Sequence, residues 1–526
     1  MPNFEIKPNI LIILADDLGY SDIGCYGGEI KTPNLDKLAE NGLRFTQFYN
    51  VARCCPSRAS LLTGLYPHQT GVGHMMEDLG LEGYRGDLNR HCVTIAEVLK
   101  RFGYRTYMSG KWHLTRFLEE PKHNWPCQRG FDRFYGIITG ASSYFQPTTL
   151  TRDNTPIEAV GKDYYITDAI SDEMCNFLIE HEEKYPDSPF FAYLSYTAPH
   201  WPLHAPEEDI QRYEGLYDVG WDVIRERRYK RLIDLGIIKK YWGLSPRDPA
   251  APDWDKVKEK IWQARRMEVY AAQVDRMDRG IGRILQTLKE IRQLDDTLII
   301  FLSDNGACAE EIRRHDVKWM LKDRIAVTKT REGRKVIFGN NPEIMPGGED
   351  TYQSYGLPWA NVSNTPFREY KHWVHEGGIA TPFIVHWPRG IKARGELRHQ
   401  PGQLPDIMAT ILDVTGATYP SEFAGYKIHP LEGFSLKPIF ENKPNGRELL
   451  YFEHEGNRAV RRAKWKLVCK YPRSWELYNM EKDRTELNDL STKHPEIVSE
   501  LSKEYDEWAK RCKVLPWDKV LARMRR

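Results

Sequence analysis

Two separate places in this 526-residue sequence put oxygen-bearing side chains directly after an apolar run. Asp16 and Asp17 follow the aliphatic residues 9–15, and Asp304 and Asn305 follow a second apolar run. Adjacent carboxylates repel each other, so burial of such a pair calls for a cation. Each site alone could be a solvated turn, but the four side chains together offer only oxygen ligands. We therefore expect a site for a hard divalent cation, calcium or magnesium.

A candidate nucleophile lies in the stretch CCPSRASLLTG, residues 54–64. We expect Pro56 and Ser57 to open a short helix with Ser57 as its cap, which places Cys54 at the positive end of the helix. That position suits a nucleophile or a bound anion. On the Cys-x-Pro spacing alone, a buried cysteine pair beside an ordinary helix start would be the simpler interpretation.

Basic side chains follow two further expected strands. Lys111 and His113 come after the strand 104–109 and lie two residues apart, so in extended chain they face the same side. His200 follows the strand 189–195 and has a proline on each side, which fixes its backbone geometry. Each of these side chains, taken alone, would more often be a surface or loop residue.

The elements that must position these residues predict an α/β fold. The continuous aliphatic run 9–15 is typical of a strand that is covered on both faces. Apolar residues recur three to four apart over 260–291, which predicts a long amphipathic helix packed on a sheet. We expect a large, mostly parallel central sheet with helices on both faces. Acids at the carboxyl edge of its strands would occupy the usual ligand position of an open α/β sheet.

The pattern changes near residue 445, where short strands begin. We expect strands over 448–453, 457–462, 465–469 and 476–479 and a helix over 495–510. This predicts a small antiparallel sheet joined to a helix. We therefore divide the chain into a catalytic α/β domain, residues 1–444, and a C-terminal α+β subdomain, residues 445–526.

Composition limits the partners and the compartment. With 75 basic and 74 acidic residues the chain has no general basic field, so we expect no nucleic-acid partner. The apolar run near the start is too short for a membrane span and lacks the flanks of a signal peptide, so we expect no membrane partner and a cytoplasmic protein. A periplasmic or secreted protein whose signal peptide had been removed would look the same. Nine cysteines without C-x-x-C spacing argue against a disulfide framework or a thiolate zinc site.

The stretch 54–64 is similar to the signature of the type I sulfatases, within the alkaline phosphatase superfamily, in which the first Cys of C-x-P-S-R is oxidised to formylglycine. The resemblance extends over nearly the whole chain, through Gly-Lys-Trp-His at 110–113, Ala-Pro-His-x-Pro at 198–202 and Ser-Asp-Asn-Gly at 303–306. A lysine five positions before Glu-Gly-Gly identifies Lys371 with the family's active-site lysine. Residues 350–366 also resemble a stretch of bacterial arylsulfatases.

The resemblance implies a mechanism. It implies that a formylglycine-generating enzyme converts Cys54, not Cys55, and that residue 54 joins the metal ligands. One oxygen of the hydrated aldehyde attacks sulfur, the alcohol leaves, and a covalent sulfoenzyme remains. The second hydroxyl then expels sulfate, with His113 as the base.

The same resemblance assigns roles to the remaining basic residues. Arg58 and Lys111 hold the formylglycine hydrate, whereas His200 and Lys371 bind the sulfate oxygens. One of His200 and Lys371 protonates the leaving oxygen.

We predict hydrolysis of a carbohydrate or aryl sulfate monoester to an alcohol and inorganic sulfate. One alternative is a phosphonate or phosphate ester hydrolase of the same superfamily, some members of which also use C-x-P-S-R. Another is a non-catalytic binder of sulfated glycans, which would require degenerate catalytic positions. We expect specificity to reside in the loops 140–153, 205–255 and 310–364, with Tyr144, Trp201 and His375 as candidate lining residues.

Overall fold

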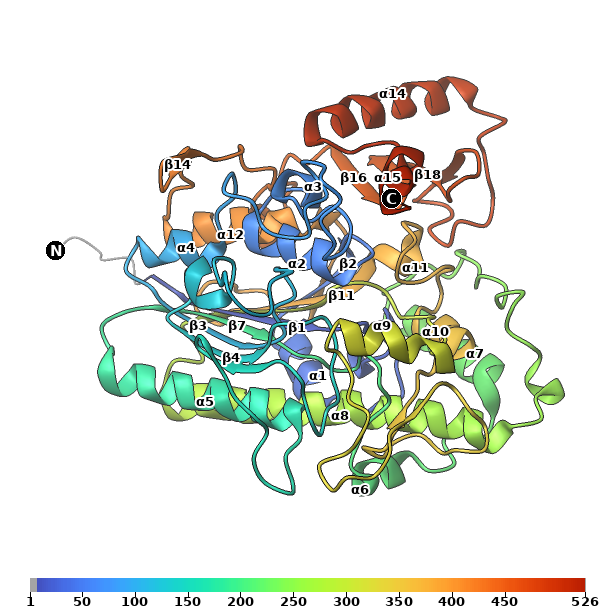
Figure 1. Ribbon diagram of the computed structural model, residues 1–526. Coiled ribbons are helices and arrows are strands. Elements are labelled where there is room, and N and C mark those ends of the chain that lie inside the picture. Colours follow the sequence, from blue (N-terminus) through green and yellow to red (C-terminus); the bar gives the residue numbers. More distant parts are fainter. Residues whose placement is uncertain (1–6, 526) are drawn as a thin grey trace.

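The computed structural model describes residues 7–525 and is built on an eleven-stranded sheet within that range (Figure 1). The strands, in order across the sheet, are β12 (Glu396–Arg398), β2 (Leu43–Tyr49), β11 (Ala380–His386), β8 (Thr297–Ser303), β1 (Asn9–Ala15), β7 (Phe190–Ser195), β3 (Arg105–Gly110), β4 (Arg133–Ile137), β5 (Leu150–Arg152) and β6 (Thr155–Pro156), with β13 (Gly402–Gln403) also paired to β2. The five neighbours β8, β1, β7, β3 and β4 run parallel, whereas β11, β5 and β6 are antiparallel to their partners. The predicted mostly parallel sheet is confirmed.

The register places the expected ligand residues side by side. β1 pairs with β8 from Asn9 opposite Thr297 to Ala15 opposite Ser303, so the two strands end together. Because both strands run the same way, the side chains that follow Ala15 and Ser303 emerge at one edge of the sheet. β1 is buried along its whole length, as the unbroken aliphatic run requires.

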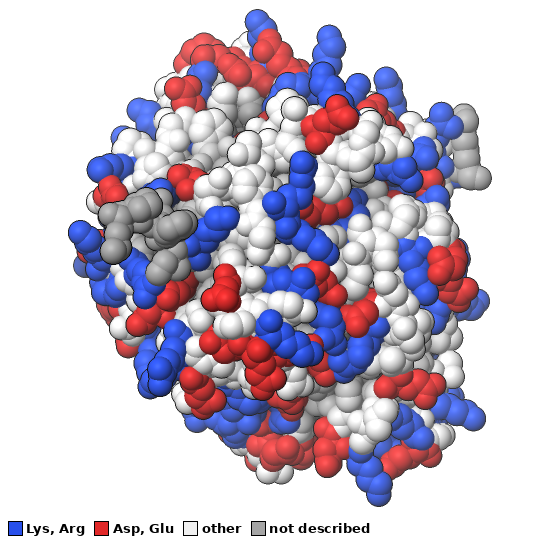
Figure 2. All heavy atoms as spheres, turned by 90° about the vertical axis from the view of Figure 1, so that its left-hand side faces the viewer, with Lys and Arg blue, Asp and Glu red and all other residues white. Residues whose placement is uncertain are grey.

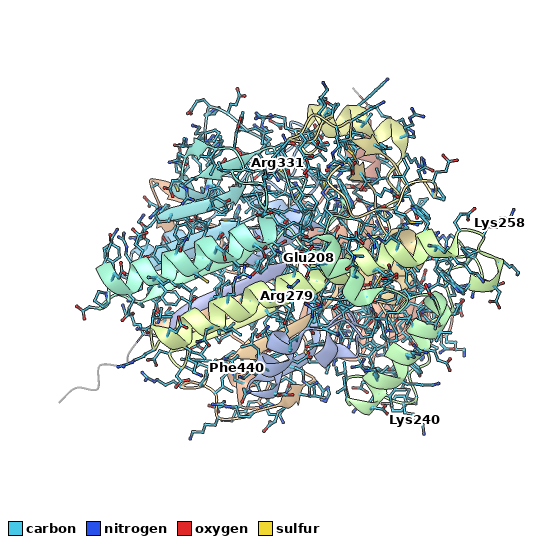
Figure 3. The ribbon with its side chains drawn as sticks, turned by 90° about the horizontal axis from the view of Figure 1, so that it is seen from below. Glu208, Lys240, Lys258, Arg279, Arg331 and Phe440 are labelled. Atoms are coloured by element: carbon cyan, nitrogen blue, oxygen red, sulfur yellow. The ribbon has the colours of Figure 1, made fainter. Side chains whose placement is uncertain are left out.

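Helices cover both faces of the sheet (Figure 1). One layer holds α1 (Pro33–Glu40), α5 (Ile166–Lys184) and α8 (Lys260–Glu290), and the other holds α2 (Cys54–Thr63), α4 (Ile95–Lys100) and α12 (Pro405–Thr415). Figure 3 shows α5 and α8 lying side by side across the lower face. Side chains of β1 alternate between the two layers: Leu11 and Ile13 pack on the first, and Ile10 and Ile12 on the second.

The C-terminal part forms the expected antiparallel sheet. Its strands are β16 (Leu449–His454), β17 (Asn457–Arg462), β18 (Trp465–Cys469) and β19 (Glu476–Asn479), and α14 (Pro495–Cys512) and α15 (Trp517–Met524) complete it. In Figure 1 this part, coloured red, lies at one end of the molecule. We keep residue 445 as the proposed boundary of the subdomain.

One predicted helix cap is wrong. α2 begins at Cys54 itself, with Arg53 as the residue before it, so Pro56 and Ser57 lie inside the first turn. Proline is tolerated there because the amide it lacks has no partner in the first turn. The Ser57 hydroxyl instead accepts a hydrogen bond from the Val51 amide at 3.0 Å.

The surface carries no single-sign field on the face that Figure 2 shows, where basic and acidic side chains are interspersed. This agrees with the formal net charge of +1. No helix within residues 7–525 is both long and apolar enough to span a membrane.

Candidate active site

Four buried oxygen-bearing side chains meet where β1 and β8 end. Asp16, Asp17, Asp304 and Asn305 are each no more than 1 % exposed. The backbone amide of Asp17 donates to Asp304 Oδ1 at 3.2 Å, and Asn305 Nδ2 donates to Asp17 Oδ1 at 2.6 Å. Asp17 has a φ of 67°, a strained conformation for aspartate of the kind that is concentrated at functional sites. The structure thus brings all four predicted side chains together.

Two oxygen atoms of this group lack a hydrogen-bond partner among the described residues, although Asp16 Oδ1 lies 3.6 Å from Arg58 Nη2. Asp16 Oδ1 and Asn305 Oδ1 are buried and accept no hydrogen bond from any residue in the described range 7–525. An orphaned buried acceptor costs about 1–3 kcal/mol, and more if it is charged. Burial, together with the neighbouring Asp16 carboxylate, raises the pKa of Asp304 to about 7. A hard divalent cation fits this site, because all of its candidate ligand atoms are oxygens and two of them make no hydrogen bond in the described part of the chain.

Three buried cations surround the acids, and each pairs with one of them. The contacts are Lys111 Nζ to Asp16 Oδ2 at 2.6 Å, Arg58 Nη2 to Asp304 Oδ2 at 2.7 Å, and Lys371 Nζ to the Asp17 carboxylate at 2.9 Å. Arg58 also donates to the carbonyl oxygen of Lys111 at 3.0 Å. These cations hold the carboxylates apart and add positive charge to the site.

Cys54 opens onto a cleft, whereas Cys55 does not. Cys54 lines the cleft, and its Sγ lies within 4.8 Å of the Cys55 thiol and of a ring nitrogen of His113. The neighbouring Cys55 thiol, together with the Lys111 ammonium, lowers the pKa of Cys54 against the opposing effect of burial. Cys55 is fully buried and donates to the His74 carbonyl oxygen at 3.5 Å. The geometry therefore favours Cys54 over Cys55 as the reactive position.

His113 lies in the cleft wall directly after β3. Burial lowers the pKa of His113 to about 4, so its imidazole is neutral near pH 7. Its Nδ1 has no hydrogen-bond partner in the part of the chain that the structure describes. Gly140 packs on the ring: a Cβ at this position would lie 2.4 Å from His113 Cε1. A neutral imidazole at the cleft wall can accept a proton.

His200 and Lys371 face each other at the other side of the acids. Lys371 Nζ lies 3.4 Å from His200 Nε2, and His200 Nδ1 lies 2.6 Å from the Trp201 carbonyl oxygen. The second contact fixes the proton on Nδ1, which leaves Nε2 facing the site. Burial lowers the pKa of His200 to about 4. The Tyr144 hydroxyl lies 2.8 Å from the carbonyl oxygens of Thr197 and His200 and supports this loop from behind.

The cleft that these residues line has a volume of about 820 Å³. Trp201, Trp319 and Met320 give one part of its wall an apolar character, and Met75 and Met76 line another part. Charged residues of both signs occur around it: Arg53, Arg116, Arg313, Lys322, Glu77, Glu310, Glu311, Asp316 and Asp323. Glu310 joins two parts of the wall, because it pairs with Arg53 Nη1 at 2.8 Å and accepts from Trp201 Nε1 at 2.9 Å.

Several predictions about the cleft need correction. Within the described chain no residue of 205–255 lines the cleft, because this segment forms α7 (Gly220–Asp234) and packs against α10 (Gly356–Ser363). Tyr144 lies behind the wall, and His375 is buried with its Nε2 3.3 Å from Glu476 Oε2. Trp201 and the loops at 140–141 and 309–325 do line the cleft.

Sequence reasoning missed the walls that Arg53, Met75, Met76 and Arg116 supply. Arg53 directly precedes Cys54, and this adjacency is a sequence signal that could have identified it as a cleft residue. The two methionines stand in an irregular loop with no periodic pattern, so no local signal marks them.

Comparison with known proteins places this geometry in a family. Residues 8–417 match the family model described as Sulfatase, and residues 368–511 match that described as N-sulphoglucosamine sulphohydrolase, C-terminal. An uncharacterized sulfatase of Schizosaccharomyces pombe is 34 % identical over 533 residues, which cover 94 % of this chain and 92 % of that protein.

Two further relatives are informative. An arylsulfatase of Klebsiella aerogenes is 35 % identical over 458 residues, covering 84 % of this chain and 94 % of that protein. The crystal structure of Ps i-CgsB superposes with a TM-score of 0.68 at 27 % identity, covering 96 % of this chain and 93 % of that chain. Ps i-CgsB has also been crystallised in complex with k-i-k-neocarrahexaose.

Proposed function

This chain belongs to the sulfatase family and hydrolyses sulfate esters, and from that premise we propose that residue 54, as formylglycine, is its nucleophile. The observation that carries this proposal is the position of Cys54: it faces the cleft at the start of α2, beside a neutral imidazole and next to a buried set of oxygen ligands with two orphaned atoms. A sulfate ester is an anion with a poor leaving group, so its hydrolysis needs cations, a strong nucleophile and an acid.

Asp16, Asp17, Asp304, Asn305 and residue 54 would hold a divalent cation, Ca²⁺ with Mg²⁺ as the alternative. When bound, the cation supplies positive charge that favours ionisation of a hydroxyl at residue 54 and stabilises negative charge on the sulfate. The four buried oxygen ligands suit this role because they carry no soft donor.

Arg58 and Lys111 orient residue 54. Both are fully buried and are fixed by their ion pairs with Asp304 and Asp16, so their charge is directed at one place. We propose that they hold the two hydroxyls of the formylglycine hydrate while one oxygen attacks sulfur. Preorganised charge of this kind acts strongly because the site excludes water.

His200 and Lys371 bind the oxygens of the sulfate group. Asp17 raises the pKa of Lys371 above its ordinary value, against the effect of burial, so its ammonium stays charged and attracts the anion. With substrate bound, the negative charges of the sulfate and of Asp17, whose Oδ2 lies 3.4 Å from His200 Nε2, favour a second proton on His200 Nε2. When the bond from sulfur to the ester oxygen breaks, either this imidazolium or the Lys371 ammonium gives a proton to that oxygen and the alcohol departs.

His113 completes the cycle. Its neutral imidazole accepts the proton of the second hydroxyl at residue 54, the carbonyl of the aldehyde re-forms, and the bond from carbon to the sulfate oxygen breaks. Inorganic sulfate leaves, and water restores the hydrate. Neither residue 54 nor His113 is consumed.

We propose that the substrate is the sulfate monoester of a sugar or of an aromatic alcohol. The tryptophan faces at the cleft wall suit the flat surface of a sugar or an aromatic ring, and the mixed charges do not form a continuous basic surface for a polyanion. The related arylsulfatase and the complex of Ps i-CgsB with an oligosaccharide support these two classes.

A competition assay tests the proposal. Protein produced together with a formylglycine-generating enzyme is given nitrophenyl sulfate and nitrophenyl phenylphosphonate, each with and without added Ca²⁺. We expect Ca²⁺-dependent release of nitrophenol from the sulfate and a much lower kcat/KM for the phosphonate. A higher kcat/KM for the phosphonate than for the sulfate in aldehyde-containing protein would contradict the assignment. A panel of sulfated monosaccharides and oligosaccharides then shows which alcohol portion of the substrate gives the highest kcat/KM.

A further inference from the structure

A second group of metal-binding side chains lies away from the sheet edge, where the C-terminal subdomain meets the catalytic part. His454 ends β16, Glu455 begins the turn into β17, and His372 follows the active-site residue Lys371. A ring nitrogen of His372, a ring nitrogen of His454 and a carboxylate oxygen of Glu455 all lie within 4.8 Å of one another. His74, from a third segment, joins them. We call these four residues the imidazole cluster.

The distances within the imidazole cluster are close to those between ligands of one ion. His372 Nδ1 lies 3.1 Å from Glu455 Oε2, His454 Nε2 lies 3.5 Å from Glu455 Oε1, and His74 Nε2 lies 2.8 Å from Glu455 Oε1. Ligand atoms in a tetrahedral zinc site with bonds near 2.1 Å are separated by roughly 3.4 Å. His372, His454 and Glu455 already lie within ligand distance of one another, and His74, which contacts Glu455, would have to approach the other two imidazoles to become a fourth ligand.

An independent observation shows that the imidazole cluster is incomplete. His454 is 0 % exposed, and neither of its ring nitrogens has a hydrogen-bond partner among the described residues. A buried imidazole without partners is costly, whereas an ion that binds its lone pair removes that cost.

Glu455 and Gly456 are the two central residues of the hairpin turn between β16 and β17. Glu455 and Gly456 have φ of 50° and 78°, and His372 has a φ of 93°. Gly456 must be a glycine, because a Cβ there would lie 2.8 Å from Trp517 Cβ. Positive φ at both turn positions is the ordinary geometry of a two-residue hairpin turn, so His372 is the strained member of the three. The side chains of His372 and Glu455 are 30 % and 22 % exposed, so an ion can enter from solvent.

We propose that His74, His372, His454 and Glu455 bind a first-row divalent cation of the Zn²⁺ type. Imidazole nitrogens select such ions over Ca²⁺, which prefers oxygen ligands, so this site and the sheet edge would take different metals. The ion ties the β16–β17 turn of the subdomain to the loop that carries Lys371. The His372 amide, which donates to the Ala52 carbonyl oxygen at 2.7 Å, extends this connection to the segment before Cys54.

The test is Zn²⁺ binding by the full-length protein, measured by titration calorimetry and by the metal content after dialysis. Cys54→Ala is used as the background because Cys54, Cys55 and His113 form a competing thiolate group, and excess Ca²⁺ is present to occupy the oxygen ligands. We expect one Zn²⁺ per chain and a rise in Tm when it binds. The Zn²⁺ affinity should fall by about 10–100-fold in Glu455→Gln and in His454→Ala.

The matched control is His123→Ala, which removes a surface histidine paired with Asp87 at 2.7 Å outside the imidazole cluster. Its Zn²⁺ affinity should equal that of the background. Glu455→Gln keeps the size of the side chain, so it remains informative if His454→Ala fails to fold. Absence of Zn²⁺ binding in the folded background, or equal binding in Glu455→Gln, would show that the imidazole cluster is only a set of hydrogen bonds.

Discussion

Two groups of buried charges lie at opposite ends of the loop that begins at Lys371, and they differ in completeness. At the sheet edge, Asp16 Oδ1 and Asn305 Oδ1 have no hydrogen-bond partner among residues 7–525. At the junction with the C-terminal subdomain, both oxygens of Glu376 are bound. We call this second group the seam, and it consists of Tyr49, Glu376, Lys466, Arg484 and Glu486.

The seam satisfies both oxygens of Glu376, although Arg484 Nη2 and Glu486 Oε1 make no hydrogen bond among the described residues. Glu376 Oε1 binds Lys466 Nζ at 2.9 Å, and Glu376 Oε2 accepts from Arg484 Nε at 2.8 Å and from the Tyr49 hydroxyl at 3.0 Å. Lys466 also pairs with Glu486 at 2.8 Å. Every oxygen of Glu376 therefore has a protein partner, whereas the sheet edge has room for a ligand. The comparison teaches that a buried carboxylate with both oxygens bound inside the chain can serve the fold alone, whereas the orphaned oxygens at the sheet edge leave room for a ligand.

The largest expected effect comes from a substitution that disables the site at the sheet edge and leaves the seam unchanged. Cys54→Ala should abolish turnover of nitrophenyl sulfate, whereas Cys55→Ala should keep most of it, because only Cys54 faces the cleft. Circular dichroism and Tm should show both variants folded. Comparable losses of activity in two folded variants would contradict the choice of Cys54.

The next largest effect is on kcat, and it distinguishes the roles of the two residues that we propose bind sulfate. His200→Ala and Lys371→Ala should each lower kcat by about two to four orders of magnitude, the ordinary worth of a general acid or an anion-binding group. The variant that lacks the acid should lose more activity on a sugar sulfate than on nitrophenyl sulfate, because nitrophenolate leaves without a proton. Equal losses on both substrates in both variants would exclude a proton donor at these two positions.

Much of the sheet edge could be predicted from sequence, because a strand covered on both faces leaves an unbroken aliphatic run and its carboxyl end is where ligands bind. The apolar strands β1 and β8 thus point directly to Asp16 and Asp304, which follow them. The resemblance of residues 54–64 to a family signature then supplied Cys54, and that of 371–378 supplied Lys371.

The seam and the imidazole cluster could not be predicted in this way. Glu376 and Lys466 are far apart in the chain, and each stands in a local pattern that fits an exposed charge equally well. His74, His372 and His454 have no common spacing, so only the folded chain brings them together. The Ser57 cap was wrong because local preference alone does not say whether proline lies at the first or a later position of the turn.

A third experiment breaks the seam. Lys466→Met leaves Glu376 and Glu486 buried without their cation, and loss of one partner of a buried ion pair costs about 3–5 kcal/mol of unfolding free energy. Urea unfolding should show this loss, whereas kcat of the folded fraction should change little. The control Lys184→Met removes an exposed pair with Glu180 and should leave the urea midpoint unchanged. Equal urea midpoints in Lys466→Met and Lys184→Met would contradict the claim that the seam stabilises the fold.

The smallest expected effect is a change in how the stability of the protein depends on pH, which tests the contribution of the seam. Burial alone would raise the pKa of Glu376, but Lys466 and Arg484 lower it to about 2 from an ordinary value of 4.5. The stability that the ionised carboxylate contributes is therefore present above pH 4.5 and is lost as the pH falls toward 2. Urea midpoints should fall over this window less steeply in Glu376→Gln than in the unsubstituted protein. Parallel curves would show that Glu376 does not carry this stability.

The central claim, a formylglycine at residue 54 that hydrolyses sulfate esters, is tested most directly by mass spectrometry of the tryptic peptide 54–58, with sulfatase activity measured on the same sample. We predict that protein produced with a formylglycine-generating enzyme carries an aldehyde in place of the Cys54 thiol. Activity should rise in proportion to the aldehyde fraction across preparations. Full activity in protein whose Cys54 remains a thiol would contradict the account.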